Sequence, residues 1–199
     1  MKNKINIKTI ITLMVITIPF IFQSCIMSSR IIQESDVVYS TKRVSFRHTT
    51  KDRNRKTPLL YLDQTFVKEI KGNKETYRVY DALNLASRGF KLDDKVFLIA
   101  DGEIFNINIE NKEYEFSRRI SENKSDVMTA DSTTISVVTG FSEDNRKITR
   151  FSYKLTDDMV SKIRNSNQII FRYYAGPSMI SVKLRNNDLK KLKKLIEIR

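Results

Sequence analysis

Few residues in this sequence are suited to acid–base or nucleophilic chemistry. The chain contains one histidine, His48, and one cysteine, Cys25, so zinc, haem and iron–sulfur sites lack their usual clusters of ligands. A catalytic triad would need His48 as its base, and the sequence offers neither a serine turn nor an acidic partner for it. Because His48 follows Arg47 at the start of a basic segment, we expect it to be exposed in a loop or at a strand end.

Three pairs of carboxylates are close enough in sequence to be considered as acid–base pairs. These pairs are Asp93 with Asp94, Asp101 with Glu103, and Asp157 with Asp158. A glycosidase needs two carboxylates at a set separation across a cleft, whereas each pair here is explained by a turn, a hairpin or a helix start. The five glycines are isolated, without the grouping of a phosphate-binding loop. We therefore expect no enzymatic activity, no metal and no cofactor.

One hairpin near the C-terminus offers a possible binding surface. Apolar residues alternate with polar ones on both sides of a turn at 175–178, and the inward set would be Ile169, Phe171, Tyr173, Ile180, Val182 and Leu184. The outward face would then carry Arg172, Tyr174, Ser181 and Lys183. Aromatic and cationic groups side by side suit a sugar or an anionic ligand. Arg172, Tyr174 and Lys183 are thus predicted to bind ligand, and a merely solvated strand face is the alternative.

The first 25 residues indicate where the protein is sent. A basic start with Lys2, Lys4 and Lys8 precedes an uncharged apolar run over residues 9–22, and Cys25 follows shortly after it. This order is typical of a secretory signal. The apolar run is short for a membrane-spanning helix, which needs about 20 residues, although an uncleaved membrane anchor remains the alternative.

The tetrad Phe22-Gln23-Ser24-Cys25 resembles a lipobox, the cleavage motif of bacterial lipoproteins, and its Gln-Ser-Cys ending is similar to Bacteroidota examples. Gln23 departs from the small or apolar residue of enterobacterial examples. The resemblance implies removal of a signal peptide over 1–24, acylation of Cys25 and attachment to the outer membrane, since two or more acyl chains anchor stably. No acidic cluster of the kind linked to surface display follows Cys25, which implies the periplasmic face. The resemblance covers these 25 residues alone.

The charge of the chain bears on its partners. The 199 residues include 36 Lys and Arg against 23 Asp and Glu, a net charge of +13. Removing residues 1–24, with their three lysines, leaves 175 residues at +10, enough for one domain with its own core. Such a surplus favours anionic partners: lipid headgroups at the membrane, an anionic envelope component such as lipopolysaccharide or acidic glycan, or nucleic acid. Another envelope protein is a separate candidate partner. Export argues against nucleic acid, and the even spread of basic residues also fits plain solubility.

The rest of the chain predicts one β-rich domain. Residues 25–36 lack apolar periodicity and are expected to form a tether before a single domain over 37–199. The basic segment 47–58 is expected to be an exposed loop. Asp-Gly at 101–102 lies between two apolar runs, the pattern of a tight hairpin, and predicts strands at 95–100 and 103–109.

Further along the chain, the polar segment 121–132 is expected to be a loop, and the apolar runs on either side of 142–145 are expected to form a second hairpin. Thr156 followed by two aspartates predicts the start of a short helix. Asn187-Asp188 starts a terminal helix with one apolar stripe, made of Leu189, Leu192, Leu195 and Ile196.

These elements predict an antiparallel β-sandwich or barrel-like sheet with a short helix and a C-terminal helix packed on it. The sequence as a whole favours a lipid-anchored envelope protein that binds or supports another component without catalysis. A binding module for anionic glycan or lipopolysaccharide is the alternative.

Overall fold

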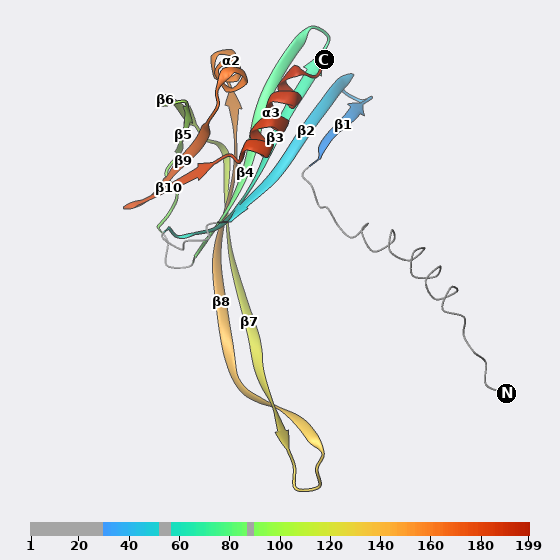
Figure 1. Cartoon of the computed structure of the whole chain (residues 1–199), viewed down its shortest axis with the longest axis vertical. Helices are drawn as coiled ribbons and strands as arrows, with labels where there is room; N and C mark the ends of the chain where they lie inside the picture. The colour runs from blue at the N-terminus through green and yellow to red at the C-terminus, as the bar shows by residue number, and fades with distance from the viewer. Residues whose placement is uncertain (1–29, 52–56, 87–89) are drawn as a thin grey trace, which may run out of the picture.

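A computed structural model of the chain describes residues 30–51, 57–86 and 90–199 (Figure 1). Cys25 and the predicted signal peptide lie outside these residues. The strands are β1 (Ile31–Asp36), β2 (Thr41–Lys51), β3 (Leu59–Lys71), β4 (Lys74–Ala86), β5 (Lys95–Ala100), β6 (Glu103–Asn108), β7 (Glu110–Met128), β8 (Thr134–Leu155), β9 (Ile169–Ala175) and β10 (Ser178–Lys183). The helices are α2 (Asp157–Asn165) and α3 (Asn186–Glu197).

The strands form two antiparallel sheets. The large sheet has the order β1-β2-β3-β4-β8-β7 and curls into a half-barrel, and the small sheet has the order β10-β9-β5-β6. This arrangement confirms the prediction of a sandwich or barrel-like sheet with a C-terminal helix. Local turns join β1 to β2, β3 to β4, β5 to β6, β7 to β8 and β9 to β10, whereas β4 pairs with β8, and β5 with β9, across longer connections. In the Asp101-Gly102 hairpin both turn residues adopt the positive φ (47° and 91°) that the sequence predicts.

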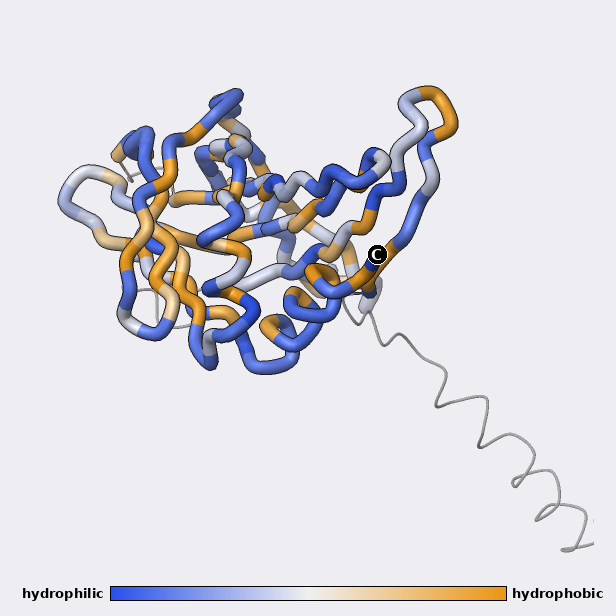
Figure 2. The backbone as a smooth tube through the Cα atoms, turned by 90° about the horizontal axis from the view of Figure 1, so that it is seen from above, coloured by the Kyte–Doolittle hydropathy of each residue, from blue (hydrophilic) through white to orange (hydrophobic). Residues whose placement is uncertain are grey.

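The hydrophobic core lies between the two sheets and under α3. In Figure 2, hydrophobic and hydrophilic segments alternate along the strands, as expected where one face of a sheet is buried. Phe46 and Phe66 of the large sheet and Phe171 of the small sheet are each at most 2% exposed. The rings of Phe66 and Phe171 meet across the interface with centroids 5.8 Å apart. The predicted inward set of the last hairpin is buried throughout.

Both predicted helices are present: α2 begins at its predicted cap, and α3 begins at Asn186, one residue before the predicted start and without a side-chain capping bond. Thr156 accepts a hydrogen bond from the backbone N–H of Met159 at the start of α2. In α3 the apolar stripe is buried as expected, and Asp188, itself buried, accepts a hydrogen bond from Arg185 at 2.7 Å. The helix packs on β2 and β3.

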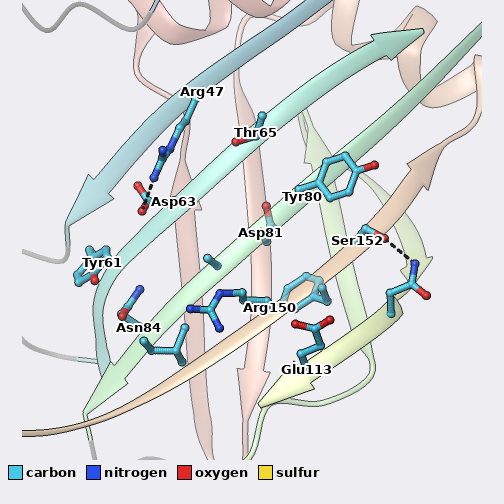
Figure 3. A pocket seen from close by; sticks show the side chains of 14 residues that line it. Arg47, Tyr61, Asp63, Thr65, Tyr80, Asp81, Asn84, Glu113, Arg150 and Ser152 are labelled. Atoms are coloured by element: carbon cyan, nitrogen blue, oxygen red, sulfur yellow. Dashed lines mark hydrogen bonds and ion pairs between the residues drawn. The ribbon is translucent and has the colours of Figure 1, made fainter. Parts of the chain in front are cut away.

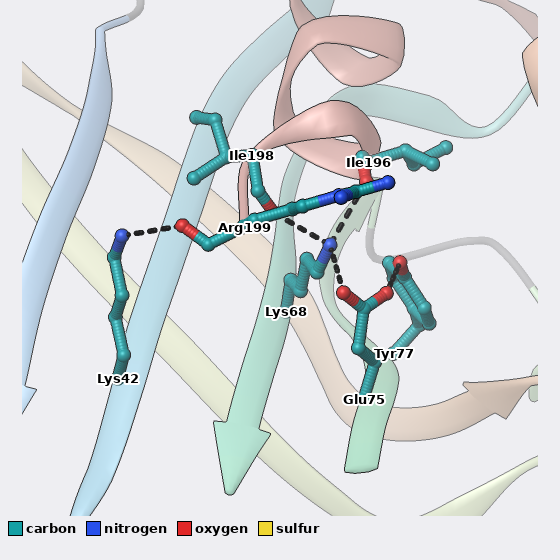
Figure 4. Close-up of polar contacts among 7 residues, drawn as sticks. All are labelled: Lys42, Lys68, Glu75, Tyr77, Ile196, Ile198 and Arg199. Atoms are coloured by element: carbon teal, nitrogen blue, oxygen red, sulfur yellow. Dashed lines mark hydrogen bonds and ion pairs between the residues drawn. The ribbon is translucent and has the colours of Figure 1, made fainter. Parts of the chain in front are cut away.

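A buried lysine holds the end of α3 to the large sheet (Figure 4). Lys68, 1% exposed, donates from Nζ to the carbonyl oxygens of Ile196 (2.9 Å) and Ile198 (2.6 Å). Its ion pair with Glu75 spans 2.9 Å. A buried ammonium is costly unless paired and hydrogen-bonded, and here the last turn of the helix supplies the missing acceptors.

Three segments differ from the sequence predictions. Residues 31–36, predicted as tether, form β1. Residues 47–51 of the predicted basic loop belong to β2, and residues 52–56 of it lie outside the described residues. The predicted loop 121–132 is largely strand, and the predicted turn at 142–145 lies inside β8.

The last difference has one cause, a two-stranded ribbon that leaves the body of the molecule (Figure 1). β8 pairs with β4 only from Arg146 to Leu155, whereas its pairing with β7 continues to Thr134. We define the arm as residues 118–145. Its 11 residues from Arg118 to Met128 extend about 36 Å at about 3.3 Å per residue. Both faces of the arm meet solvent, so its sequence lacks the alternation that marks a half-buried strand.

Candidate ligand site on the outer face of the large sheet

A pocket of about 520 Å³ lies on the large sheet, lined by residues from β2, β3, β4, β7 and β8 (Figure 3). Strand alternation decides which side chains reach it. On β3, Leu62 and Gln64 are buried against the small sheet, so Tyr61 and Asp63 point to the other face. The pocket is thus on the face opposite the core.

Both arginines that line the pocket pair with a carboxylate, Arg47 with one in the lining and Arg150 with one beside it. Arg47 contacts Asp63 at 3.0 Å, and Thr49 donates a hydrogen bond to the same carboxylate. Arg150 contacts Glu115 of β7 at 2.5 Å. Four charged side chains line the pocket from this face of the sheet. Two are basic, Arg47 and Arg150, and two are acidic, Asp63 and Glu113, so their charges cancel.

Two tyrosines mark the ends of the pocket. Tyr61 lies opposite Asn84 in the pairing of β3 with β4, and Tyr80 lies four residues from Asn84 along β4. This spacing separates the two ends by about 13 Å, and Figure 3 shows the tyrosines on opposite sides. Tyr80 is 40% exposed. Its ring can therefore stack against a ligand without first breaking a packed contact.

Asn84 lies beside Tyr61, at the same end of the pocket, and one of its side-chain atoms lacks a hydrogen bond. The residue is 3% exposed, and its Oδ1 has no hydrogen-bond partner among the described residues. A buried acceptor without a donor costs about 1–3 kcal/mol. A ligand hydroxyl or amide group in the pocket would be a suitable donor.

The inner face of the same strands carries a row of polar residues. His48, Gln64 and Asp81 lie directly opposite one another on β2, β3 and β4. His48 Nε2 lies 2.9 Å from Gln64 Oε1, and Gln64 Nε2 donates to the hydroxyls of Tyr153 (3.1 Å) and Tyr173 (3.3 Å). We call these five residues the polar cluster.

Asp81 is the charged end of the polar cluster. Its Oδ2 accepts hydrogen bonds from Tyr153 (3.1 Å) and Tyr173 (2.8 Å), and its Oδ1 has no partner among the described residues. Burial raises the pKa of Asp81 to about 7, although the bond from Tyr173 opposes this shift. The carboxyl group therefore titrates near neutral pH.

The expectation for His48 is wrong. The residue is 2% exposed and lies in the interior, with its ring 5.8 Å from Phe46 and 5.9 Å from Phe66. Burial lowers its pKa, partly offset by the hydrogen bond to Gln64. The basic segment after it suggested a loop, but β2 continues past His48 and strand alternation turns its side chain inward.

The predicted ligand-binding residues share one face, on the small sheet and away from the pocket. Arg172 Nε donates to Ser181 at 3.1 Å, and Lys183 Nζ donates to Gln168 at 2.6 Å. The ring of Tyr174 contacts Phe97 edge-on, with centroids 5.7 Å apart. The outward face of the last hairpin is therefore as predicted.

The predicted carboxylate pairs have local partners. Asp94 contacts Lys112 at 2.6 Å, and Asp101 accepts backbone hydrogen bonds from Asn167 and Gln168. These bonds hold the pKa of both carboxyl groups below the usual range. Asp157 and Asp158 occupy the first turn of α2, as predicted.

Sequence reasoning did not find the pocket. Its residues come from five strands and span positions 47–152, so only the register of the sheet brings them together. The alternation in β4 places Tyr80 and Asn84 on the side away from the core. Alternation thus predicts the face on which these residues lie, but it does not indicate that this face has a pocket.

No group of three or more His, Cys, Asp or Glu side chains within residues 30–51, 57–86 and 90–199 is placed to hold a metal ion. Among the helices that the structure describes, none has the length and apolar character needed to cross a membrane. Comparison of the chain with protein-family models, curated proteins and solved structures gave no match.

Proposed function

We propose that this protein is a lipid-anchored envelope protein that binds a neutral, hydroxyl-rich ligand, such as a stretch of oligosaccharide, without catalysis. The observation that carries the binding proposal is the pocket on the large sheet, with tyrosines at its two ends and the unpartnered amide oxygen of Asn84 at the Tyr61 end. Aromatic rings combined with a few convergent polar groups are typical of small-ligand sites.

The charge balance of the pocket favours a neutral ligand. Arg47 and Arg150 already contact carboxylates, so an anion would have to compete with Asp63 and Glu115 for them. A neutral hydroxyl group can instead bond to the paired carboxylates and to Asn84 without separating any charges. Polar pairing of this kind gives selectivity, because an ill-matched ligand leaves buried groups without partners.

The anchoring part of the proposal rests on the sequence alone. The basic start, the apolar run and the Gln-Ser-Cys ending support acylation of Cys25 after removal of residues 1–24. Attachment at the periplasmic face of the outer membrane follows from the resemblance to bacterial lipoproteins. Non-catalytic binding is consistent with the local partners found for Asp94 and Asp101.

Titration calorimetry on the full chain in non-ionic detergent tests the ligand. The probes are neutral hexasaccharides (maltohexaose, cellohexaose and chitohexaose) and an acidic counterpart, hexagalacturonate. We expect one neutral probe to bind, and Tyr80→Ala to weaken it about tenfold, as loss of one aromatic contact of about 1.4 kcal/mol would.

The matched control is Tyr39→Ala, since Tyr39 is 68% exposed and lies outside the pocket. Binding should be unchanged in this variant. Equal losses in the two variants, or no binding of any neutral probe, would overturn the pocket as a glycan site.

A second candidate is an anionic glycan on the outer face of the small sheet. It is favoured by Arg172, Tyr174 and Lys183 sharing that face and by the net charge of +13. Binding of hexagalacturonate that is lost on Arg172→Ala with Lys183→Ala, and kept in Tyr80→Ala, would support this site instead.

A further inference from the structure

The arm differs from the rest of the chain in charge. Residues 118–145 include three basic and five acidic residues, a net charge of −2, on a chain whose remaining residues carry +15. Two of the acidic residues, Glu143 and Asp144, pair with arginines at the base of the arm. Towards the tip, the acidic residues Glu122, Asp126 and Asp131 outnumber the one basic residue, Lys124, which pairs with Glu122 at 3.3 Å.

The arm also exposes many apolar side chains to solvent. Phe141 is 70% and Met128 72% exposed, and five further aliphatic side chains are more than 40% exposed. These five are Ile120, Val127, Ile135, Val137 and Val138. Apolar surface gathered on one projecting element marks an interaction site.

A surface of opposite charge lies at the other edge of the large sheet. A cavity of about 410 Å³ there is lined by three basic residues, Arg30, Lys191 and Lys194, together with Ile31, Gln33 and Ile198. No acidic side chain lines it. We call it the basic groove. Its isoleucines offer apolar contact, and its cations suit the acidic tip of an arm.

Backbone groups complete the match. β1, which borders the basic groove, is the first strand of the large sheet, and within the described residues only β2 pairs with it. β7 is the last strand and pairs only with β8 there. An edge strand with free N–H and C=O groups can accept an added strand.

We propose that the arm of one copy docks on the basic groove and β1 edge of a second copy. Acidic residues near the tip face the groove cations, Phe141 and its apolar neighbours cover Ile31 and Ile198, and β7 or β8 of the arm adds to the sheet beside β1. The contact joins two different surfaces, so an open assembly of any length still has one free arm at one end and one free groove at the other, and it grows head to tail.

This inference does not depend on the ligand of the pocket. The arm and the groove share no lining residue with that pocket. Oligosaccharide titration and self-association therefore succeed or fail separately.

Sedimentation of the full chain in non-ionic detergent, from about 1 to 100 µM, tests the proposal. We expect species larger than a monomer that grow with concentration. Reversing arm charges (Glu122→Lys with Asp126→Lys) should weaken association about tenfold or more, because like charges then meet. Reversing the groove (Arg30→Glu with Lys194→Glu) should do the same.

The decisive variant combines both reversals in one chain, which should restore association because the charges are complementary again. Thermal unfolding of each variant confirms that it is folded. Arm-to-arm pairing, or insertion of the apolar arm into detergent or lipid, would leave association unchanged on groove reversal. Three outcomes would overturn the proposal. They are unchanged association on groove reversal, a native chain that is still monomeric at 100 µM, and a double reversal that does not restore association.

Discussion

β8 is one strand in two environments. Phe141 and Phe151 lie ten residues apart, and the register irregularity near Phe151 inserts its extra residue in β7, so both side chains project from the same face of β8. Phe151 is 3% exposed between the two sheets, whereas Phe141 is 70% exposed in the arm. The hydrogen-bond ladder with β7 runs past both residues.

The difference shows what a covering layer contributes. Backbone pairing alone contributes little net stability, because it replaces hydrogen bonds to water, and an isolated two-stranded ribbon is marginal. In the body, the face of β8 gains the burial of its aromatic side chains against the small sheet. In the arm the same face is left for another surface, which is the physical basis for the docking proposal.

The largest test of this comparison is Phe151→Ala. Removing a buried phenylalanine loses its burial and leaves a cavity, so we expect the free energy of unfolding to fall by about 3–5 kcal/mol. Urea unfolding followed by tyrosine fluorescence or circular dichroism measures it. A loss below about 1 kcal/mol would mean that the small sheet does not cover this part of β8.

The next test uses pH and concerns the body alone. The pKa of Asp81 is raised to about 7, so its protonated form is favoured on folding. This contribution is fully present below the unfolded-state pKa near 4 and is lost as pH rises towards 7, by up to about 4 kcal/mol. The lowered pKa of His48 acts in the opposite direction, since it removes stability as pH falls below 6.5.

Asp81→Asn isolates the first contribution. Its free energy of unfolding, relative to the native chain, should rise between pH 4 and pH 8, whatever fixed cost the substitution itself has. Urea titrations of both proteins at several pH values measure this. A constant difference across that range would show that Asp81 does not carry the raised pKa.

The smallest expected effect is that of Phe141→Ala, the partner of the first test. Because the side chain is largely exposed, the free energy of unfolding should change by less than about 0.5 kcal/mol. The same variant should weaken self-association, so chemical denaturation at low protein concentration separates the two effects. A loss comparable to that of Phe151→Ala would show that the arm is packed against the body.

Local signals predicted the parts of the fold that depend on a few adjacent residues. The Asp101-Gly102 turn and the Thr156 cap act over one turn of chain, and the structure has both where the sequence places them. The arm was missed for the converse reason. Its strands bury neither face, so they contain polar residues, such as Glu143 and Asp144, of the types that usually indicate a turn.

The candidate site needed information that no single segment contains. Alternation correctly groups Asp81 with Val79 and Leu83 on one side of β4, yet it does not reveal that Tyr173 comes from the other sheet to meet it. His48 likewise has its partner, Gln64, on the next strand. Pairing register and sheet packing are properties of the whole fold, so the polar cluster and the pocket became visible only with the structure.

The polar cluster also fixes the position of the small sheet relative to the large sheet. Apolar side chains tolerate small slips of one sheet over the other, because burial has no direction. The hydrogen bond from Tyr173 in the small sheet to Asp81 in the large sheet tolerates little, since its strength falls steeply as distance and angle depart from ideal values. The bond between Tyr173 and Asp81 thus fixes how the small sheet is placed on the large sheet. It also restrains the strands of the large sheet whose other face carries the pocket.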